Sequence, residues 1–215
     1  GLKHFRSLYE TCSGSILWQF NDMWPAISWA VLDYTGFRKL AWHAMKAAYR
    51  PRTICVGRVD QGAQVTIIND LGQPWNCEVD VALVSASGDI VNTHRIKLTI
   101  PAYGVSRTAM TDHFTEIEKG DYEGFIVATS NEYRAARRST LQPAKTAPQH
   151  DLNFTTELKG DGLQVVVKAN RYLHELSLLS EIVGIGTQVD SQMAYLFPGE
   201  CHAFNVTGHL EVLTE

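Results

Sequence analysis

Residues 14–29, with the sequence GSILWQFNDMWPAISW, contain three of the five tryptophans of this chain. The run 15–20 is apolar and predicts a short β-strand. Asn21, Asp22 and Pro25 end this strand, because asparagine and aspartate favour turns and proline cannot donate a hydrogen bond to a neighbouring strand. We therefore expect a strand that leads into a polar and aromatic loop.

Flat rings beside polar side chains, at the end of a strand, are a common way to build a sugar-binding site. Aromatic rings pack against the apolar C–H face of a pyranose, and amides and carboxylates bond to its hydroxyl groups. The other interpretation is packing, since tryptophan is highly buried on average. Taken alone, these residues leave both interpretations open.

The composition sets the class of protein. The chain has 215 residues, 45% of them hydrophobic, which is enough to build one large or two small domains with packed cores. A net charge of −4 argues against a nucleic-acid partner. No apolar run approaches the roughly 20 residues that span a bilayer, so no membrane partner is expected. No signal-peptide pattern opens the sequence, which slightly favours a cytoplasmic location.

The metal-ligating residue types are scattered along the chain. Cys12, Cys55, Cys77 and Cys201 have no metal-ligand spacing, and they leave open two disulfide bridges or four reduced thiols. The eight histidines are dispersed as well. The sequence therefore predicts no metal site and no cofactor.

Residues 1–51 predict helix, strand, loop and helix. Apolar side chains recur at helical spacing over residues 2–9 and again over 37–49, and Pro51 closes the second helix. A segment of this size is too small to form a domain of its own.

From residue 52 the pattern changes to short strands. The clearest example is Cys77, Val79, Val81 and Leu83, which alternate with polar or small residues. Roughly seven such strands over residues 52–142 are typical of an antiparallel β-sandwich. Residues 143–150 are polar and rich in proline, which predicts a linker. A second strand-rich unit follows in residues 151–215, with a turn at 159–162 between its first two strands.

The run 18–25, followed by Ser28-Trp29 and Asp33-Tyr34, resembles the segment that closes the catalytic barrel of family 2 glycoside hydrolases, and most of all the bacterial and fungal β-mannosidases. Two further runs, 65–71 and 189–200, give weaker support. The resemblance implies a mainly β chain. It would consist of two immunoglobulin-like antiparallel β-sandwich domains, 52–142 and 151–215, preceded by the last helix-strand-helix of a (β/α)8 barrel in residues 1–51.

The resemblance also implies a function. The family consists of retaining exo-glycosidases, which use two carboxylic acids. Both are glutamates on earlier barrel strands, and Glu10 is the only glutamate in residues 1–51. No catalytic residue is therefore predicted here. The chain is expected to be the C-terminal region of a β-mannosidase, with a β-mannoside as substrate and the upstream barrel of the parent chain as partner.

The resemblance carries over only a binding role. Trp18 matches the tryptophan that stacks against the sugar at the end of the last barrel strand. Asn21 and Asp22 either contact sugar hydroxyls or hold the loop around Trp18. Trp24 and Trp29 are expected to pack behind it. The predicted substrate-binding set is Trp18, Asn21, Asp22 and Trp24.

Two alternatives remain. One is a non-catalytic carbohydrate-binding or adhesion β-sandwich protein. An aromatic platform on a sandwich face would support this alternative. The other is a different family 2 enzyme, a glucosaminidase or a galactosidase.

Overall fold

The computed structural model describes residues 1–59, 62–85, 87–110, 124–131, 133–138, 152–159, 162–180 and 186–208. These residues form two short helices and several antiparallel sheets, so the predicted mainly β class is confirmed. The chain divides into two compact units. Unit 1 comprises Gly1–Ser15 and Ala47–Thr146, and unit 2 comprises Ile16–Lys46 and Ala147–Glu215. The predicted linker 143–150 lies outside the described residues, and the predicted domain boundaries stay predictions.

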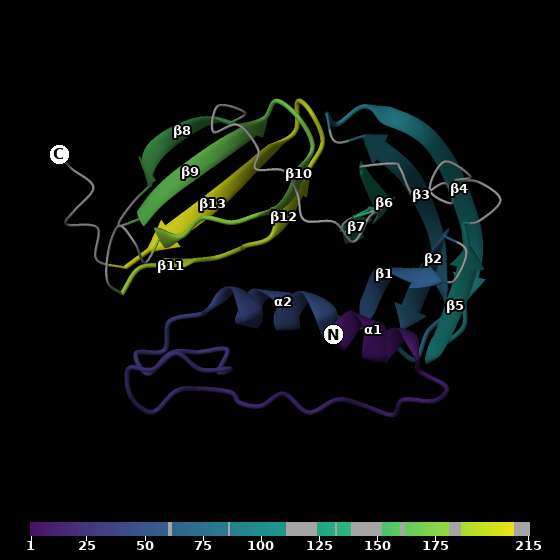
Figure 1. Cartoon of the computed structure of the whole chain (residues 1–215), viewed down its shortest axis with the longest axis horizontal. Coiled ribbons are helices and arrows are strands. Elements are labelled where there is room, and N and C mark those ends of the chain that lie inside the picture. The colour runs from purple at the N-terminus through teal and green to yellow at the C-terminus, as the bar shows by residue number, and fades with distance from the viewer. Residues whose placement is uncertain are drawn as a thin grey trace. The chain divides into compact units, whose positions relative to one another are not determined.

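Unit 1 is a sandwich-like pair of antiparallel sheets (Figure 1). The first sheet has the order β1-β2-β5, with strands Arg52–Val59, Gly62–Asn69 and Gly104–Ala109. The second has the order β4-β3-β6-β7, with strands Ile90–Ile100, Trp75–Ser85, Gly124–Ser130 and Tyr133–Arg138. Side chains from both sheets meet in one buried core, which includes Ile54, Val65, Val79, Leu83 and Ile126.

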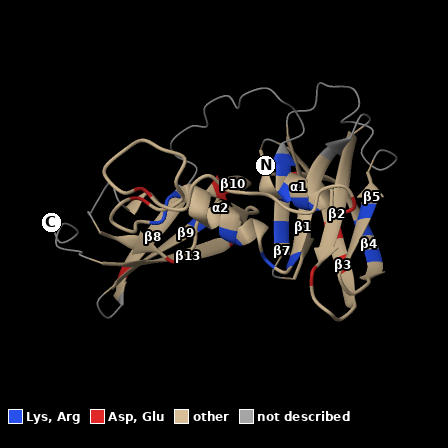
Figure 2. Ribbon diagram, turned by 90° about the horizontal axis from the view of Figure 1, so that it is seen from below, with Lys and Arg blue, Asp and Glu red and all other residues tan. Residues whose placement is uncertain are grey.

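The alternation predicted for β3 is present from Trp75 to Val81, where odd-numbered residues are buried and even-numbered ones exposed. Two of the exposed residues form ion pairs across to β4, at 2.8 Å from Glu78 to Lys97 and 2.6 Å from Asp80 to Arg95. Figure 2 shows these charges of opposite sign on the two strands. The alternation of apolar and polar side chains along β3 thus gives the strand one face in the core and one face in solvent.

Helix α1, Leu2–Ser7, packs against β1 and β2 of unit 1. It ends earlier than predicted, and the guanidinium of Arg107 on β5 donates to the carbonyl oxygen of Ser7, its last residue, at 2.7 and 3.1 Å. A cation at this end also complements the helix dipole. Neither helix in the described part of the chain is long and apolar enough to cross a membrane.

Unit 2 contains a four-stranded antiparallel sheet in the order β11-β13-β9-β8. Its strands are Gln188–Val189, Cys201–Thr207, Gly162–Ala169 and Leu152–Lys159. A second sheet pairs β10, Leu173–Leu176, with β12, Ala194–Leu196. The core is small: Val165, Val167, Val189, Phe204 and Val206 are buried, and four leucines pack against them.

All four cysteines are free thiols, which settles the question that the sequence left open. Cys55 and Cys77 are buried, and burial raises the pKa of both thiols. Cys201 is exposed. Since the thiolate is the reactive form, we expect iodoacetamide to alkylate Cys201 readily and to reach Cys55 and Cys77 only after unfolding. Mass spectrometry of the alkylated peptides measures this order, and early labelling of Cys55 in the folded protein would contradict it.

Candidate functional site

The predicted strand at residues 15–20 is wrong. Only the residues that follow Trp18 find a backbone partner: the amides of Val31 and Leu32 donate to the carbonyl of Phe20 at 3.2 and 3.0 Å, and Asp22 donates to Leu32 at 3.0 Å. A strand needs a neighbouring strand, and the structure gives residues 16–18 none. The peptide bond between Trp18 and Gln19 is cis. Residues 16–29, named the aromatic loop from here on, therefore form an open loop.

An ion pair between a buried carboxylate and a partly exposed lysine fixes the base of the aromatic loop. Asp22 is 5% exposed, and its Oδ2 accepts a hydrogen bond from Lys39 Nζ at 2.6 Å. Its Oδ1 accepts one from the hydroxyl of Ser28, which in turn accepts the amide of Ala30 at 3.0 Å. The hydrogen bonds from Lys39 and then from Ser28 hold the pKa of the Asp22 carboxyl below its ordinary value. One carboxylate thus joins both ends of the loop to Lys39.

The connection to helix α2, Leu40–Ala48, is fixed by a second carboxylate. Asp33 Oδ1 accepts the amides of Thr35 and Phe37, each at 2.8 Å, and the Thr35 hydroxyl at 2.7 Å. Burial raises the pKa of Asp33, but these hydrogen bonds outweigh it and the net direction is downward. The helix begins three residues later than predicted. Phe37 and Lys39 instead pair by backbone hydrogen bonds with Asp33 and Val31.

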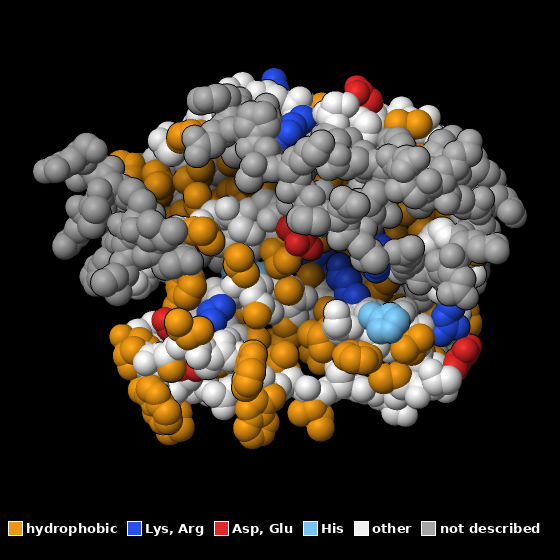
Figure 3. Space-filling view, viewed as in Figure 1, with side chains coloured by type: hydrophobic (Ala, Val, Ile, Leu, Met, Phe, Trp, Pro, Cys, Tyr) orange, Lys and Arg blue, Asp and Glu red, His pale blue; other side chains and the backbone are white. Residues whose placement is uncertain are grey.

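Large apolar side chains project from this fixed base. Trp18, Trp24 and Trp29 are 73%, 66% and 81% exposed. Figure 3 shows hydrophobic side chains gathered on the surface where Figure 1 draws this segment. The other exposed apolar residues of the loop are Ile16, Phe20, Met23 and Ile27. Trp24 and Trp29 are thus exposed in this structure, and their packing behind the loop stays a prediction. Monomeric soluble proteins rarely expose such patches unless they bind something.

The structure separates the two polar residues that the sequence treated as a pair. Both oxygens of Asp22 are occupied by Lys39 and Ser28, so this carboxylate holds the loop. Asn21 is exposed, and its Nδ2 donates to the backbone oxygen of Asp22 at 3.0 Å. The loop therefore offers ring faces and the side-chain amides of Gln19 and Asn21 to a ligand, on a base that is fixed in place.

The pKa of Asp22 predicts how the loop responds to acid. A lowered pKa in the folded state means that the ion pair stabilises the loop at neutral pH, and that this stabilisation is lost as the pH falls below the ordinary value of 3.8. We expect the hydrogen-exchange protection of the Val31 and Leu32 amides to be constant from about pH 7 to pH 5 and to fall below about pH 4.

The variant Asp22→Asn tests this assignment, because it removes the charge at every pH. We expect its Val31 and Leu32 amides to show the low, acid-like protection already at neutral pH. Asp80→Asn is the matched control, since Asp80 lies in an exposed ion pair on β3. Equal profiles for the wild type and Asp22→Asn would contradict the role of Asp22.

Two further groups of polar side chains in the described part of the chain do not form a catalytic site. Ser191 Oγ and His202 Nε2 lie 3.0 Å apart, but Asp190 is bonded to Asn205 and Ser191, so the three do not form a hydrolytic triad. Glu10 is exposed and pairs with Arg107 at 3.2 Å. Among the described residues no group of three or more histidine, cysteine, aspartate or glutamate side chains could hold a metal ion.

Comparison with known proteins finds relatives for part of the chain. No family model matches it. A β-mannosidase B from Emericella nidulans is 47% identical over 47 residues, which is 22% of this chain and 6% of that protein. A β-mannosidase B from Aspergillus niger is 40% identical over 87 residues, which is 34% of this chain and 10% of that protein. The match therefore spans at most a tenth of either relative.

Solved structures match the fold over nearly the whole chain. A β-D-mannosidase from Dictyoglomus thermophilum has a TM-score of 0.74 at 16% identity, and the match covers 97% of this chain and 26% of that one. An exo-chitosanase from Amycolatopsis orientalis has a TM-score of 0.60 at 14% identity, over 94% of this chain and 28% of that one. At these identities the likeness concerns the fold.

Proposed function

We propose that this chain, which is homologous in part to fungal β-mannosidase B and has the fold of the C-terminal region of a family 2 β-mannosidase, belongs to a retaining exo-β-mannosidase. The parent enzyme would hydrolyse terminal non-reducing β-D-mannose residues. In this proposal residues 1–51 are the last helix-strand-helix segment of its catalytic barrel, and the strands after them form two immunoglobulin-like domains that support the barrel.

The aromatic loop carries this proposal. Exposed ring faces on a base fixed by Asp22 and Lys39 provide a rigid surface for the C–H face of a sugar. The active sites of (β/α)8 enzymes lie at the C-terminal ends of the barrel strands. In this proposal Trp18 lies at the C-terminal end of the last strand. Trp18 would stack on the sugar, Asn21 and Trp24 would contact it, and Asp22 would act only by positioning the loop.

The two catalytic carboxylic acids would belong to other parts of the parent enzyme. Retention requires a nucleophile and an acid/base about 5–5.5 Å apart. Glu10, the only glutamate in residues 1–51, is exposed and paired with Arg107. We therefore expect this chain alone to bind one side of the substrate without hydrolysing it.

Two alternatives make different predictions. A glucosaminidase is favoured by the likeness to the exo-chitosanase, although the TM-score of that match is lower, 0.60 against 0.74. A non-catalytic carbohydrate-binding or adhesion protein would bind sugar through the aromatic loop of this chain alone. The first alternative changes the substrate and the second removes the reaction.

A chimera distinguishes them. It carries residues 1–51 of this chain in place of the corresponding segment of the Emericella nidulans relative, and it is assayed with chromogenic β-mannoside, β-glucosaminide and β-galactoside. We expect hydrolysis of the β-mannoside by the chimera and none by this chain alone. Preference for the β-glucosaminide or the β-galactoside would favour another family 2 enzyme, a glucosaminidase or a galactosidase. Hydrolysis by this chain alone would overturn the assignment of the catalytic groups.

A further inference from the structure

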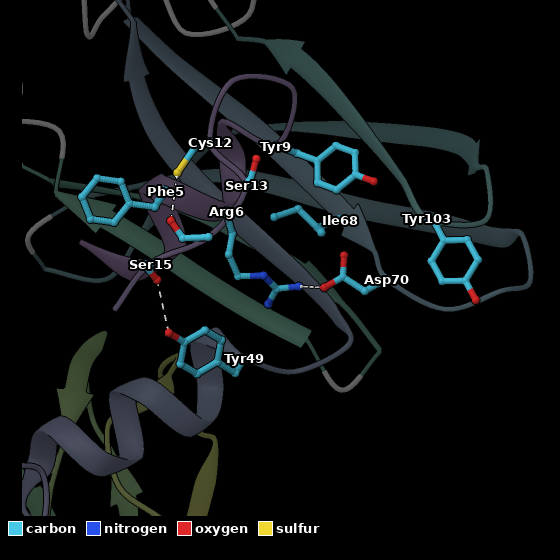
Figure 4. Close-up of a pocket in the computed structure, with 11 residues that line it drawn as sticks. Phe5, Arg6, Tyr9, Cys12, Ser13, Ser15, Tyr49, Ile68, Asp70 and Tyr103 are labelled. Atoms are coloured by element: carbon cyan, nitrogen blue, oxygen red, sulfur yellow. Dashed lines mark hydrogen bonds and ion pairs between the residues drawn. The ribbon is translucent and has the colours of Figure 1, made fainter. Parts of the chain in front are cut away.

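Unit 1 contains a pocket of about 340 Å³, none of whose lining residues belongs to the aromatic loop. It is lined by α1, the turn after it, Tyr49, the end of β2 and the turn before β5 (Figure 4). Its volume lies at the lower end of the range of about 300–1,000 Å³ found for small-molecule sites. A mono- or disaccharide has this size.

The pocket contains an ion pair between Arg6 and Asp70, whose opposite charges cancel. The side chain of Arg6 is 13% exposed, and its Nη2 donates to Asp70 Oδ2 at 2.6 Å. Arg6 also donates to the carbonyl oxygens of Ala48 and Arg50, at 2.9 Å for Arg50. A guanidinium already surrounded by three acceptors favours a neutral ligand, because an anion would have to displace Asp70.

The pocket offers acceptors and hydroxyl groups for a ligand with several hydroxyls. The side chain of Asp70 is 47% exposed, which leaves Oδ1 open to accept hydrogen bonds while Oδ2 is held by Arg6. Ser15 Oγ lies 3.2 Å from Tyr49 OH, so each hydroxyl is fixed by the other. Carboxylate and hydroxyl groups that converge on one cavity are the polar partners of sugars.

Aromatic rings surround these polar groups. Phe5, Tyr9, Tyr49 and Tyr103 are between 44% and 64% exposed and line the same pocket. Figure 4 draws the four rings around the Arg6–Asp70 pair. Exposed ring faces next to polar groups suit the apolar face of a pyranose.

The position of Tyr103 is held by the backbone. Its φ of +52° is rare for a residue with a side chain, and such conformations cluster at ligand sites. Its amide donates to Leu71 O at 3.1 Å, and a Cβ added to Gly72 would lie only 2.9 Å from its hydroxyl oxygen. Gly72 therefore leaves room for the Tyr103 ring beside the pocket.

We propose that this pocket binds a neutral mono- or disaccharide through its aromatic rings and the free oxygen of Asp70. No residue of the aromatic loop takes part in this site, although Phe5, Tyr9 and Tyr49 belong to the segment 1–51 that the proposed function assigns to the barrel. The site gives unit 1 a sugar-binding role of its own.

Saturation-transfer NMR on the 215-residue chain tests this proposal with methyl β-D-mannoside and cellobiose, and with acyclic sorbitol as a probe without a ring face. We expect transfer to the C–H protons of the two sugars but not to sorbitol. Tyr9→Ala and Asp70→Asn should each weaken binding about ten-fold. Tyr9→Ala removes only an exposed ring, so it keeps the test valid if Asp70→Asn disturbs the fold.

Two controls separate this site from the aromatic loop. Phe154→Ala removes an exposed ring from β8 of unit 2, and Trp18→Ala removes one from the loop. We expect Phe154→Ala to bind both sugars like the wild type, and the loss of cellobiose binding to be confined to the pocket variants Tyr9→Ala and Asp70→Asn. Binding that is lost in Trp18→Ala and kept in Tyr9→Ala would overturn the pocket proposal and favour a binding function of the loop. Absence of transfer to both sugars would overturn the pocket proposal, whereas the hydrolase proposal is tested separately by the activity of the chimera.

Discussion

Replacement of Trp18 with alanine is expected to lower kcat/KM of the chimera for the β-mannoside by about 30-fold. Stacking of an aromatic ring contributes about 0.5–1.5 kcal/mol beyond the area that it buries, and burial of the ring adds a further 1–2 kcal/mol, so a loss of about 2 kcal/mol is reasonable. Steady-state kinetics measures the change directly as a free energy. The effect should be large because Trp18 projects from a base that Asp22 and Lys39 hold in place.

Trp29→Ala is the matched control for this variant. Trp29 has the same side chain, lies in the same loop and is similarly exposed, at 81% against 73% for Trp18. The resemblance to the β-mannosidases gives it no contact with sugar, so we expect a change within about three-fold, or roughly 0.6 kcal/mol. If Trp29→Ala lowered kcat/KM as much as Trp18→Ala, the loop would act as one apolar surface and the specific role of Trp18 would be wrong.

Phe204→Ala is expected to lower the free energy of unfolding of unit 2 by about 3–5 kcal/mol. Phe204 lies on β13, is 1% exposed and stands opposite Val165 of β9. It is the largest of five buried residues in a small core. A domain has only about 5–15 kcal/mol of stability, so this loss is a large share of the total. Chemical denaturation measures it, followed by the amide signals of β9 and β13.

Phe154→Ala controls for the removal of a phenyl ring from the same sheet. Phe154 lies on β8 and is 68% exposed, so its replacement should change stability by less than about 0.5 kcal/mol. Equal effects of the two substitutions would mean that the core of unit 2 is not centred on Phe204.

The sequence predicted the strands best where a local pattern decides the structure. The alternation around Val79 needs only neighbouring residues, and it placed β3 correctly. Strand β5 was missed, because its residues are nearly all half-buried and show no alternation. What fixes β5 is its pairing with β2, some 40 residues away along the chain, and no local pattern contains that information.

The predicted binding set was chosen by resemblance, and the structure divides it by burial. Trp18 and Trp24 are exposed, whereas Asp22 is buried against Lys39, which is seventeen residues away. No spacing rule links these two residues, so the ion pair could not be found from the sequence. The pocket of unit 1 could not be predicted for the same reason, because its ion pair links Arg6 to Asp70, 64 residues further along the chain.

Covalent labelling of the catalytic nucleophile tests the central claim most directly. A retaining glycosidase forms a covalent glycosyl-enzyme intermediate, and a 2-fluoromannosyl fluoride traps it because its hydrolysis is slow. The chimera and this chain alone are treated with the reagent, and the labelled peptide is identified by mass spectrometry. We expect one fluoromannosyl group on the chimera, on a glutamate outside residues 1–51, and none on this chain alone. A label on an aspartate or glutamate of this chain would contradict the account.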